Sequence, residues 1–205
     1  MTISRALGAD GSKIAELLSE SLTVPCFGYS LLDKIAEEIG INKSLMDLID
    51  EKGPAPLDRW SYSAVTHGKV SSREQYYRLM SRVISSIAKG GAVIIGRGAN
   101  LILAHEPRVF RVRIEGSLDT RAKRVAERQG ISIHAAKEFV VRFDKEQKQF
   151  SKEIYKIHPT QRTHYELLLS SDDIERHAAV DIIIHAMEKM GYYVPGSSTI
   201  KQQGL

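Results

Sequence analysis

The sequence predicts an α/β protein built on a parallel β-sheet with helices on both faces. Residues 2–5 form a short run with β-branched side chains, followed by a turn with Gly8 and Gly11 and then by a helical pattern. Residues 92–95 are a continuous apolar run, which is typical of a strand covered on both faces. Strand and helix patterns alternate along the chain, and this alternation favours parallel strands joined by helical crossovers.

The alternation predicts five strands and a set of helices between them. The strands are expected near Thr2, Val24, Ala92, Val109 and Tyr165. Because residues 109–114 carry arginines at alternate positions, we expect this strand nearer the edge of the sheet. The helices are expected at 14–22, 30–40, 42–49, 71–89, 100–105, 117–129, 132–156 and 174–190. The expected N-terminal caps are Ser30, Ser71 or Ser72, Ser117, Ser132 and the pair Asp172 and Asp173.

Composition excludes several classes of protein. The chain has 205 residues, of which 42% are hydrophobic and 26% charged, as in ordinary globular proteins. Its single cysteine, Cys26, excludes an intramolecular disulfide framework and fits a reducing compartment. No apolar run approaches the roughly 20 residues of a membrane span, and no secretory signal pattern opens the sequence. We therefore expect a cytoplasmic protein without a membrane partner.

The first strand, glycine turn and helix have the order of a phosphate-binding loop. In such loops the backbone N–H groups and the helix N-terminus face an anion. The usual consensus is GxxxxGK[ST]. When the following helix is matched to it, Gly11 falls on the lysine position, Ser12 falls on the magnesium-binding hydroxyl position, and Lys13 comes two residues late. An ordinary strand-to-helix turn with a serine cap explains the same pattern equally well.

A second glycine turn, Gly96-Arg97-Gly98, follows the apolar strand. Because the carboxyl ends of parallel strands share one edge of the sheet, this turn and the first one are expected to lie together. Arg97 could bind an acceptor phosphate bidentately there, and the alternative is a salt bridge to a neighbouring helix.

Basic residues elsewhere have weaker signals. The segment 142–148 is suited to close over a ligand as a lid, although a solvated charged face explains it equally well. Arg121, Arg124 and Arg128 lie at helical spacing and are expected to be surface charges.

Several segments together resemble one family. They are residues 3–15, 25–37, 93–104, 112–132 and 143–145, with the segment Gly96-Arg97-Gly98-Ala99 among the most specific parts. In these segments the chain resembles the cytidylate kinase-like family, whose loop reads roughly ISRxxGSGGxxIA. That family also lacks the usual lysine at the position of Gly11.

The resemblance implies a P-loop kinase fold of the nucleoside monophosphate kinase type in a single domain. It also implies phosphoryl transfer from ATP, with Mg²⁺, to a pyrimidine nucleoside monophosphate such as CMP or dCMP. The implied parts are a core at 1–28, 70–141 and 163–192, an acceptor-binding insertion at 29–69, a lid at 142–162, and a polar tail at 193–205.

The resemblance also assigns expected roles to individual residues. The donor phosphates are expected on Gly8, Ala9, Asp10, Gly11, Ser12 and Lys13, with Ser12 also facing the metal. The acceptor is expected to contact Tyr29, Asp33, Arg59, Arg97 and Asp144. The groups expected to act on the transferring phosphoryl group are Lys13, Arg97, Arg142 and Lys145.

Two departures from the family pattern keep a second function open. The carboxylate of Asp10 stands where a small residue is common, and it would repel a β-phosphate unless it were turned outward or paired. Relatives place an Asp-Arg-x-Arg pattern in the lid, where this chain has Asp144, Lys145, Glu146 and Gln147. A catalytically weak or inactive nucleotide-binding module with a regulatory or scaffolding role is therefore the alternative.

A third function, nucleic-acid binding, is less favoured. It rests only on the basic balance of the chain and the basic segment 142–162, which carries no recognition motif.

Overall fold

A five-stranded parallel β-sheet forms the centre of the computed structural model, which describes residues 1–28, 70–155 and 162–195. The strands lie in the order β2-β3-β1-β4-β5. They are β1 (Thr2–Arg5), β2 (Cys26–Phe27), β3 (Val93–Ile95), β4 (Arg111–Glu115) and β5 (Leu167–Ser170). The helices are α1 (Gly11–Leu22), α5 (Val70–Lys89), α6 (Ala99–Ile102), α7 (Leu118–Gln129), α8 (Ile133–Tyr155) and α9 (Arg176–Lys189). The predicted fold class is confirmed, and all five strands lie where the sequence placed them.

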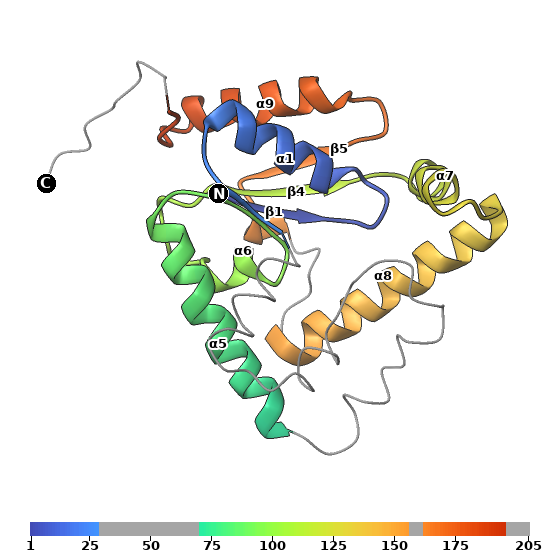
Figure 1. Ribbon diagram of the computed structural model, residues 1–205, viewed down its shortest axis with the longest axis horizontal. Helices are drawn as coiled ribbons and strands as arrows, with labels where there is room; N and C mark the ends of the chain where they lie inside the picture. The colour runs from blue at the N-terminus through green and yellow to red at the C-terminus, as the bar shows by residue number, and fades with distance from the viewer. Residues whose placement is uncertain (29–69, 156–161, 196–205) are drawn as a thin grey trace, which may run out of the picture.

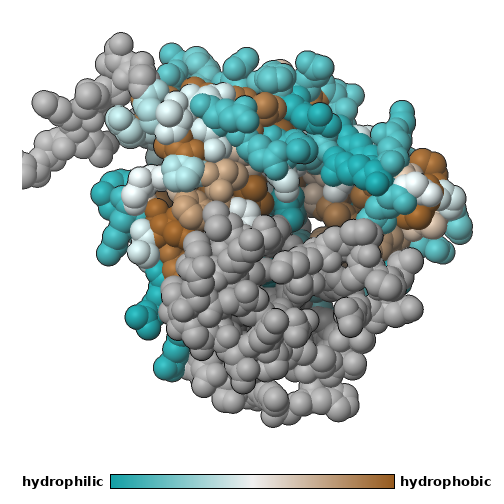
Figure 2. Space-filling view, viewed as in Figure 1, coloured by the Kyte–Doolittle hydropathy of each residue, from teal (hydrophilic) through white to brown (hydrophobic). Residues whose placement is uncertain are grey.

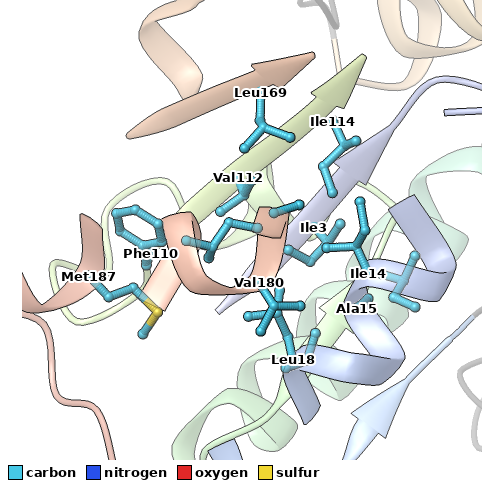
Figure 3. Packing of buried hydrophobic residues seen from close by; sticks show 14 of the residues in the cluster. Ile3, Ile14, Ala15, Leu18, Phe110, Val112, Ile114, Leu169, Val180 and Met187 are labelled. Atoms are coloured by element: carbon cyan, nitrogen blue, oxygen red, sulfur yellow. The ribbon is translucent and has the colours of Figure 1, made fainter. Parts of the chain in front are cut away.

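Helices cover both faces of the sheet (Figure 1). Helices α1 and α9 pack together on one face, where Ile14, Leu18 and Ile183 are fully or almost fully buried against the strands. Figure 3 shows this core from close by. Helices α5 and α6 cover the opposite face around Met80 and Ile84. Burial on both faces explains why β3 reads as a continuous apolar run.

The carboxyl ends of β1 and β4 point toward α7 (Figure 1). The register pairs Ile3 with Ile95 of β3 on one side and with Val112 of β4 on the other. The turns that follow β1, β3 and β4 therefore leave the sheet at one edge, which is where ligands bind in open parallel sheets.

Serines cap the N-termini of two helices, as predicted. The Ser117 hydroxyl accepts a hydrogen bond from the Thr120 N–H at the start of α7, and Ser132 accepts one from Ala135 at the start of α8. The predicted cap of α5 is wrong, because this helix begins at Val70 and Ser71 and Ser72 lie inside its first turn.

The strand β4, which the sequence places nearer the edge of the sheet, lies one strand in from that edge, between β1 and β5. Its arginines are tolerated inside the sheet because each has a carboxylate partner. Arg111 donates from Nε to Glu166 at 3.0 Å, and Arg113 donates from Nε to Glu115 at 2.6 Å. Pairing replaces the water that these charges would otherwise need.

Some expectations fall outside the described residues. These are the insertion at 29–69 with Tyr29, Asp33 and Arg59, its two helices and the Ser30 cap, and most of the polar tail. Residues 142–155 of the predicted lid continue α8 as regular helix. No helix in the described part of the chain combines the length and hydropathy that spanning a bilayer requires.

Two adjacent isoleucines on α9 test the packing of the core. Ile183 is fully buried, whereas Ile182 is 41% exposed. We expect Ile183→Ala to lower the free energy of unfolding by about 2–5 kcal/mol, because it removes buried methyl groups and leaves a cavity. Ile182→Ala is the matched control and should change it by about 0.5 kcal/mol or less. Chemical denaturation measures both, and similar losses would contradict the packing of α9 described above.

Candidate phosphate-binding site

The turn between β1 and α1 has the backbone of a tight anion-binding loop. Gly8 has φ +81°, and a Cβ added there would lie 2.5 Å from the carbonyl oxygen of Arg121. Only glycine therefore lets α7 approach the turn this closely. Asp10 is the N-cap of α1 and adopts the left-handed conformation with φ 61°. The first N–H groups of α1 then begin at the carboxyl edge of the sheet, where the end of a helix favours anions.

Three arginines surround the Asp10 carboxylate. The side chain of Asp10 is only 5% exposed. Arg176 of α9 donates to its Oδ2 at 2.9 Å, Arg128 of α7 hydrogen-bonds Oδ1, and the Nε of Arg124 lies 3.8 Å from Oδ2. Two helices distant in sequence therefore converge on one carboxylate of the loop.

This cluster sets the ionisation of Asp10. Burial on its own would raise the pKa of the carboxyl, but the hydrogen bond from Arg176 and the positive charges of Arg128, Arg176 and Arg124 outweigh it. The net effect lowers the pKa below its ordinary value of 3.8. Asp10 is thus ionised at neutral pH, and its negative charge is balanced by these three arginines.

Two arginines of α7 also fix the backbone of the turn. Arg121 donates to the Leu7 carbonyl at 3.3 Å, and Arg124 donates to the Gly8 carbonyl at 3.4 Å and to the Ser171 hydroxyl at 2.9 Å. Arg121 is itself buried and donates to both carboxylate oxygens of Asp144, at 3.1 and 2.8 Å. This pair ties α8 to α7 and the turn.

The prediction that Arg121, Arg124 and Arg128 are surface charges is wrong for Arg121, which is buried, and for Arg124, which is 22% exposed. Arg128 is 51% exposed, as predicted, and also pairs with Asp10. Sequence spacing placed them on one stripe of α7, but it could not show that this stripe faces a buried carboxylate. The predicted cap at Asp172 is wrong as well. Its carboxylate accepts from the Ser117 N–H at 2.8 Å, at the start of α7, whereas the N-cap of α9 is Glu175.

Two predicted site residues of the first helix, Ser12 and Lys13, have different partners in the structure. Lys13 lies on the outer side of α1, where its ammonium is 2.9 Å from Glu16 and its side chain is 61% exposed. Ser12 accepts a hydrogen bond from the Nε of Arg5 at 3.3 Å. Lys13 is thus paired with Glu16, and both side chains line the cavity beside the Asp10 cluster.

The surroundings of Ser12 do not fit the predicted magnesium role. A guanidinium group donates to its hydroxyl, and this positive charge disfavours a divalent cation at the same oxygen. Mg²⁺ is usually held through one or two carboxylates and substrate phosphates. Within the ranges that the structure describes, no group of three or more His, Cys, Asp or Glu side chains could hold a metal ion.

Arg97 lies on the turn after β3, at the same edge as the Asp10 turn. It is 8% exposed and has φ 49° between Gly96 and Gly98. A left-handed conformation at a residue other than glycine costs about 1–3 kcal/mol and tends to occur at functional sites. Asp10 shares this conformation, so both turns predicted to bind phosphate have it.

The remaining predicted residues lie on α8. Arg142 and Lys145 are exposed, and the guanidinium carbon of Arg142 is 5.8 Å from the centroid of the Phe139 ring. Asp144 is joined to Arg121 as described above. Their roles in a lid or in substrate binding stay predictions.

A cavity of about 600 Å³ opens beside the Asp10 cluster, between α1 and α9. Its lining combines apolar side chains, Ile14, Leu17 and Ile174, with charged side chains of both signs. The basic ones are Lys13, Arg124 and Arg176, and the acidic ones are Asp10, Glu16, Glu20 and Glu175. In Figure 2, hydrophilic side chains gather over α1, α7 and α9 on the visible face. The arrangement can accommodate an organic group and place an anionic group attached to it on the arginines.

The Asp10 cluster has a measurable effect on stability. Since the pKa of Asp10 is lowered in the folded state, its contribution is present above the ordinary value near 3.8 and is lost as the pH falls through the lower folded value. We expect Asp10→Asn, which keeps the left-handed backbone accessible, to lower the free energy of unfolding by about 1–3 kcal/mol at pH 7. The difference from wild type should shrink below about pH 4.

Urea denaturation at several pH values measures this difference. Asp119→Asn is the matched control, because Asp119 lies on the same helix as two of the arginines but is 79% exposed. A difference for Asp10→Asn that is the same at pH 3 and pH 7 would contradict the ion-pair account.

The chain is similar to known proteins in sequence and in structure. The chain is 25% identical over 175 residues, 83% of each chain, to a protein named cytidylate kinase from Methanopyrus kandleri. A crystal structure of an uncharacterised protein from Eubacterium ventriosum has a TM-score of 0.69 at 21% identity, covering 92% of this chain and 97% of that one. A shikimate kinase from Bacteroides thetaiotaomicron has a TM-score of 0.50 at 15% identity, covering 92% and 95%.

The structural likenesses establish the fold, which is that of the P-loop kinases. The family is established by sequence. Residues 1–173 match the cytidylate kinase-like family, so the chain belongs to that family, as the resemblance of its motifs predicted.

Proposed function

We propose that the protein is an ATP-dependent kinase that transfers the γ-phosphate to a pyrimidine nucleoside monophosphate, CMP or dCMP. The observation that carries the proposal is the convergence of arginines on the turn between β1 and α1. Phosphoryl transfer requires positioning and charge neutralisation more than covalent chemistry from the protein. The family and the relative named cytidylate kinase support the choice of acceptor.

The donor nucleotide would bind across the turn and the neighbouring cavity. Its phosphates would face the N-terminus of α1 and the guanidinium groups of Arg124, Arg128 and Arg176. Its nucleoside would enter the cavity between α1 and α9, where Ile14, Leu17 and Ile174 offer apolar contact. In this arrangement the phosphates and the Asp10 carboxylate compete for the same three cations.

The acceptor phosphate would bind at Arg97. Arg97 lies on the turn that follows β3, the strand next to β1, so it would approach the donor site from the neighbouring turn. A guanidinium group can hold two oxygens of a phosphate at once and so orient the acceptor for in-line attack. Arg142 and Lys145 would approach the transferring group only if α8 moved toward the site.

A nucleotide-binding module without turnover is the second candidate, and specific contacts favour it. Gly11 offers no lysine, Lys13 is engaged by Glu16, and Asp10 holds three of the arginines that a donor would need. Such a site could bind nucleotide and still fail to neutralise the charge of the transferring group.

A coupled phosphotransfer assay with ATP and Mg²⁺ against a panel of nucleoside monophosphates separates the two candidates. We expect turnover on a pyrimidine monophosphate, and a loss of about 10- to 150-fold in kcat/KM for that acceptor in Arg97→Ala, because a charged hydrogen-bonding group is removed. Arg97→Lys keeps the charge but loses the bidentate geometry, so it should recover only part of the activity. The KM for ATP should change little in either variant.

Arg108→Ala is the matched control, because the Arg108 side chain is 83% exposed and pairs only locally with Glu106. Absence of turnover on every acceptor, with ATP still raising the melting temperature, would replace the kinase by the binding module.

A further inference from the structure

Arg5, the last residue of β1, occupies the space in which a side chain at position 11 would begin. A Cβ built on Gly11 would lie 2.5 Å from the Cβ of Arg5 and 3.2 Å from its Cγ. Real Cβ atoms do not approach one another this closely, and both contacts are with the stem of Arg5 near its backbone. Arg5 therefore leaves no room for a side chain at position 11.

The same side chain reaches the first turn of α1. The Nε of Arg5 donates to the Ser12 hydroxyl at 3.3 Å, which places the guanidinium group beside the N-terminus of this helix. The backbone N–H groups of that terminus are the part of the loop expected to face phosphate.

The loop consensus gives this packing a chemical meaning. In GxxxxGK[ST] the lysine follows the first glycine by six positions. With Gly11 on the lysine position, Arg5 falls on the first glycine and Asp10 on the second. The left-handed φ of 61° at Asp10 supports this register, since glycine adopts that conformation most readily. The chain thus has an arginine where the consensus has its first glycine, and a glycine where the consensus has its lysine.

We propose that Arg5 supplies the phosphate-binding cation of this loop, in place of the lysine that Gly11 replaces. The inference rests on the proposed function in that the anion is the polyphosphate of a nucleotide. A guanidinium group at Arg5 reaches the loop from β1, whereas a lysine would reach it from α1. It also presents several N–H donors in a plane, which suits two phosphate oxygens at once. Within this proposal Gly11 is required because a side chain at this position would occupy the space of the Arg5 side chain.

Binding measurements on position 5 test the proposal without requiring turnover. Calorimetry would compare ATP, inorganic tripolyphosphate and adenosine as ligands of wild type and Arg5→Gln. We expect the affinity for ATP and for tripolyphosphate to fall about 10- to 100-fold in Arg5→Gln, while adenosine binding is unchanged. Arg108→Gln is the control at an exposed arginine. A merely structural role for Arg5 would instead weaken all three ligands and lower the melting temperature.

Exchange of the two side chains tests the relocation itself. Gly11→Lys alone should lower the melting temperature, because its stem would collide with that of Arg5. Gly90→Lys is the matched control, since the nearest atom to a new Cβ there is 3.7 Å away. The double variant Arg5→Gly with Gly11→Lys should restore both the melting temperature and the tripolyphosphate affinity to within about tenfold of wild type.

The outcomes separate this inference from the proposed function. Weaker ATP and tripolyphosphate binding in Arg5→Gln supports the inference even if wild type transfers phosphate to no acceptor, in which case only the kinase proposal fails. Equal tripolyphosphate affinity in wild type and Arg5→Gln overturns the inference even if turnover is found. Absence of ATP and tripolyphosphate binding in wild type overturns it as well, because Arg5 then has no phosphate to hold.

Discussion

The ionised carboxylate of Asp10 is the constraint on which the rest of the site depends. A buried charge is tolerated only where opposite charges and hydrogen bonds replace its water. Here the replacement comes from Arg124 and Arg128 of α7 and from Arg176 of α9. One side chain in the turn therefore fixes how two helices, more than a hundred residues further along the chain, meet the start of α1. The close approach of α7 at Gly8 completes the same arrangement.

The cluster also determines what binding a phosphate would cost. An arginine that already neutralises an internal carboxylate contributes to a ligand only the difference between the two interactions. A polyphosphate carries more charge than one carboxylate, and it would also gain the N-terminus of α1. The three arginines are thus positioned before any ligand arrives, although each is partly engaged. Preorganisation favours affinity, whereas competition with Asp10 reduces it, and the balance bears on both the kinase and the binding-module proposals.

Local sequence patterns were sufficient for the fold and insufficient for the site. The β-branched runs at β1 and β3 and the serine caps of α7 and α8 act within a few residues, so the sequence shows them directly. The roles of Arg124, Arg128 and Asp172 depend on contacts between α7 and segments far away along the chain, and no local pattern contains them. One signal was present. Arg176 stands in the first turn of α9, where the helix dipole disfavours a cation, and this position calls for an anionic partner nearby.

Departures from a motif have a different meaning when they are considered in pairs. Taken singly, Asp10 adds a repulsive charge to the loop and Gly11 removes its cation, and both changes suggest loss of function. Taken with their contacts, Asp10 belongs with the arginines that neutralise it, and Gly11 belongs with the arginine that packs over it. Each pair is consistent only if both members are present, because either substitution alone would bury an unpaired charge or create a steric clash. The physical unit in this loop is therefore the contacting pair, and a consensus of single positions cannot describe it.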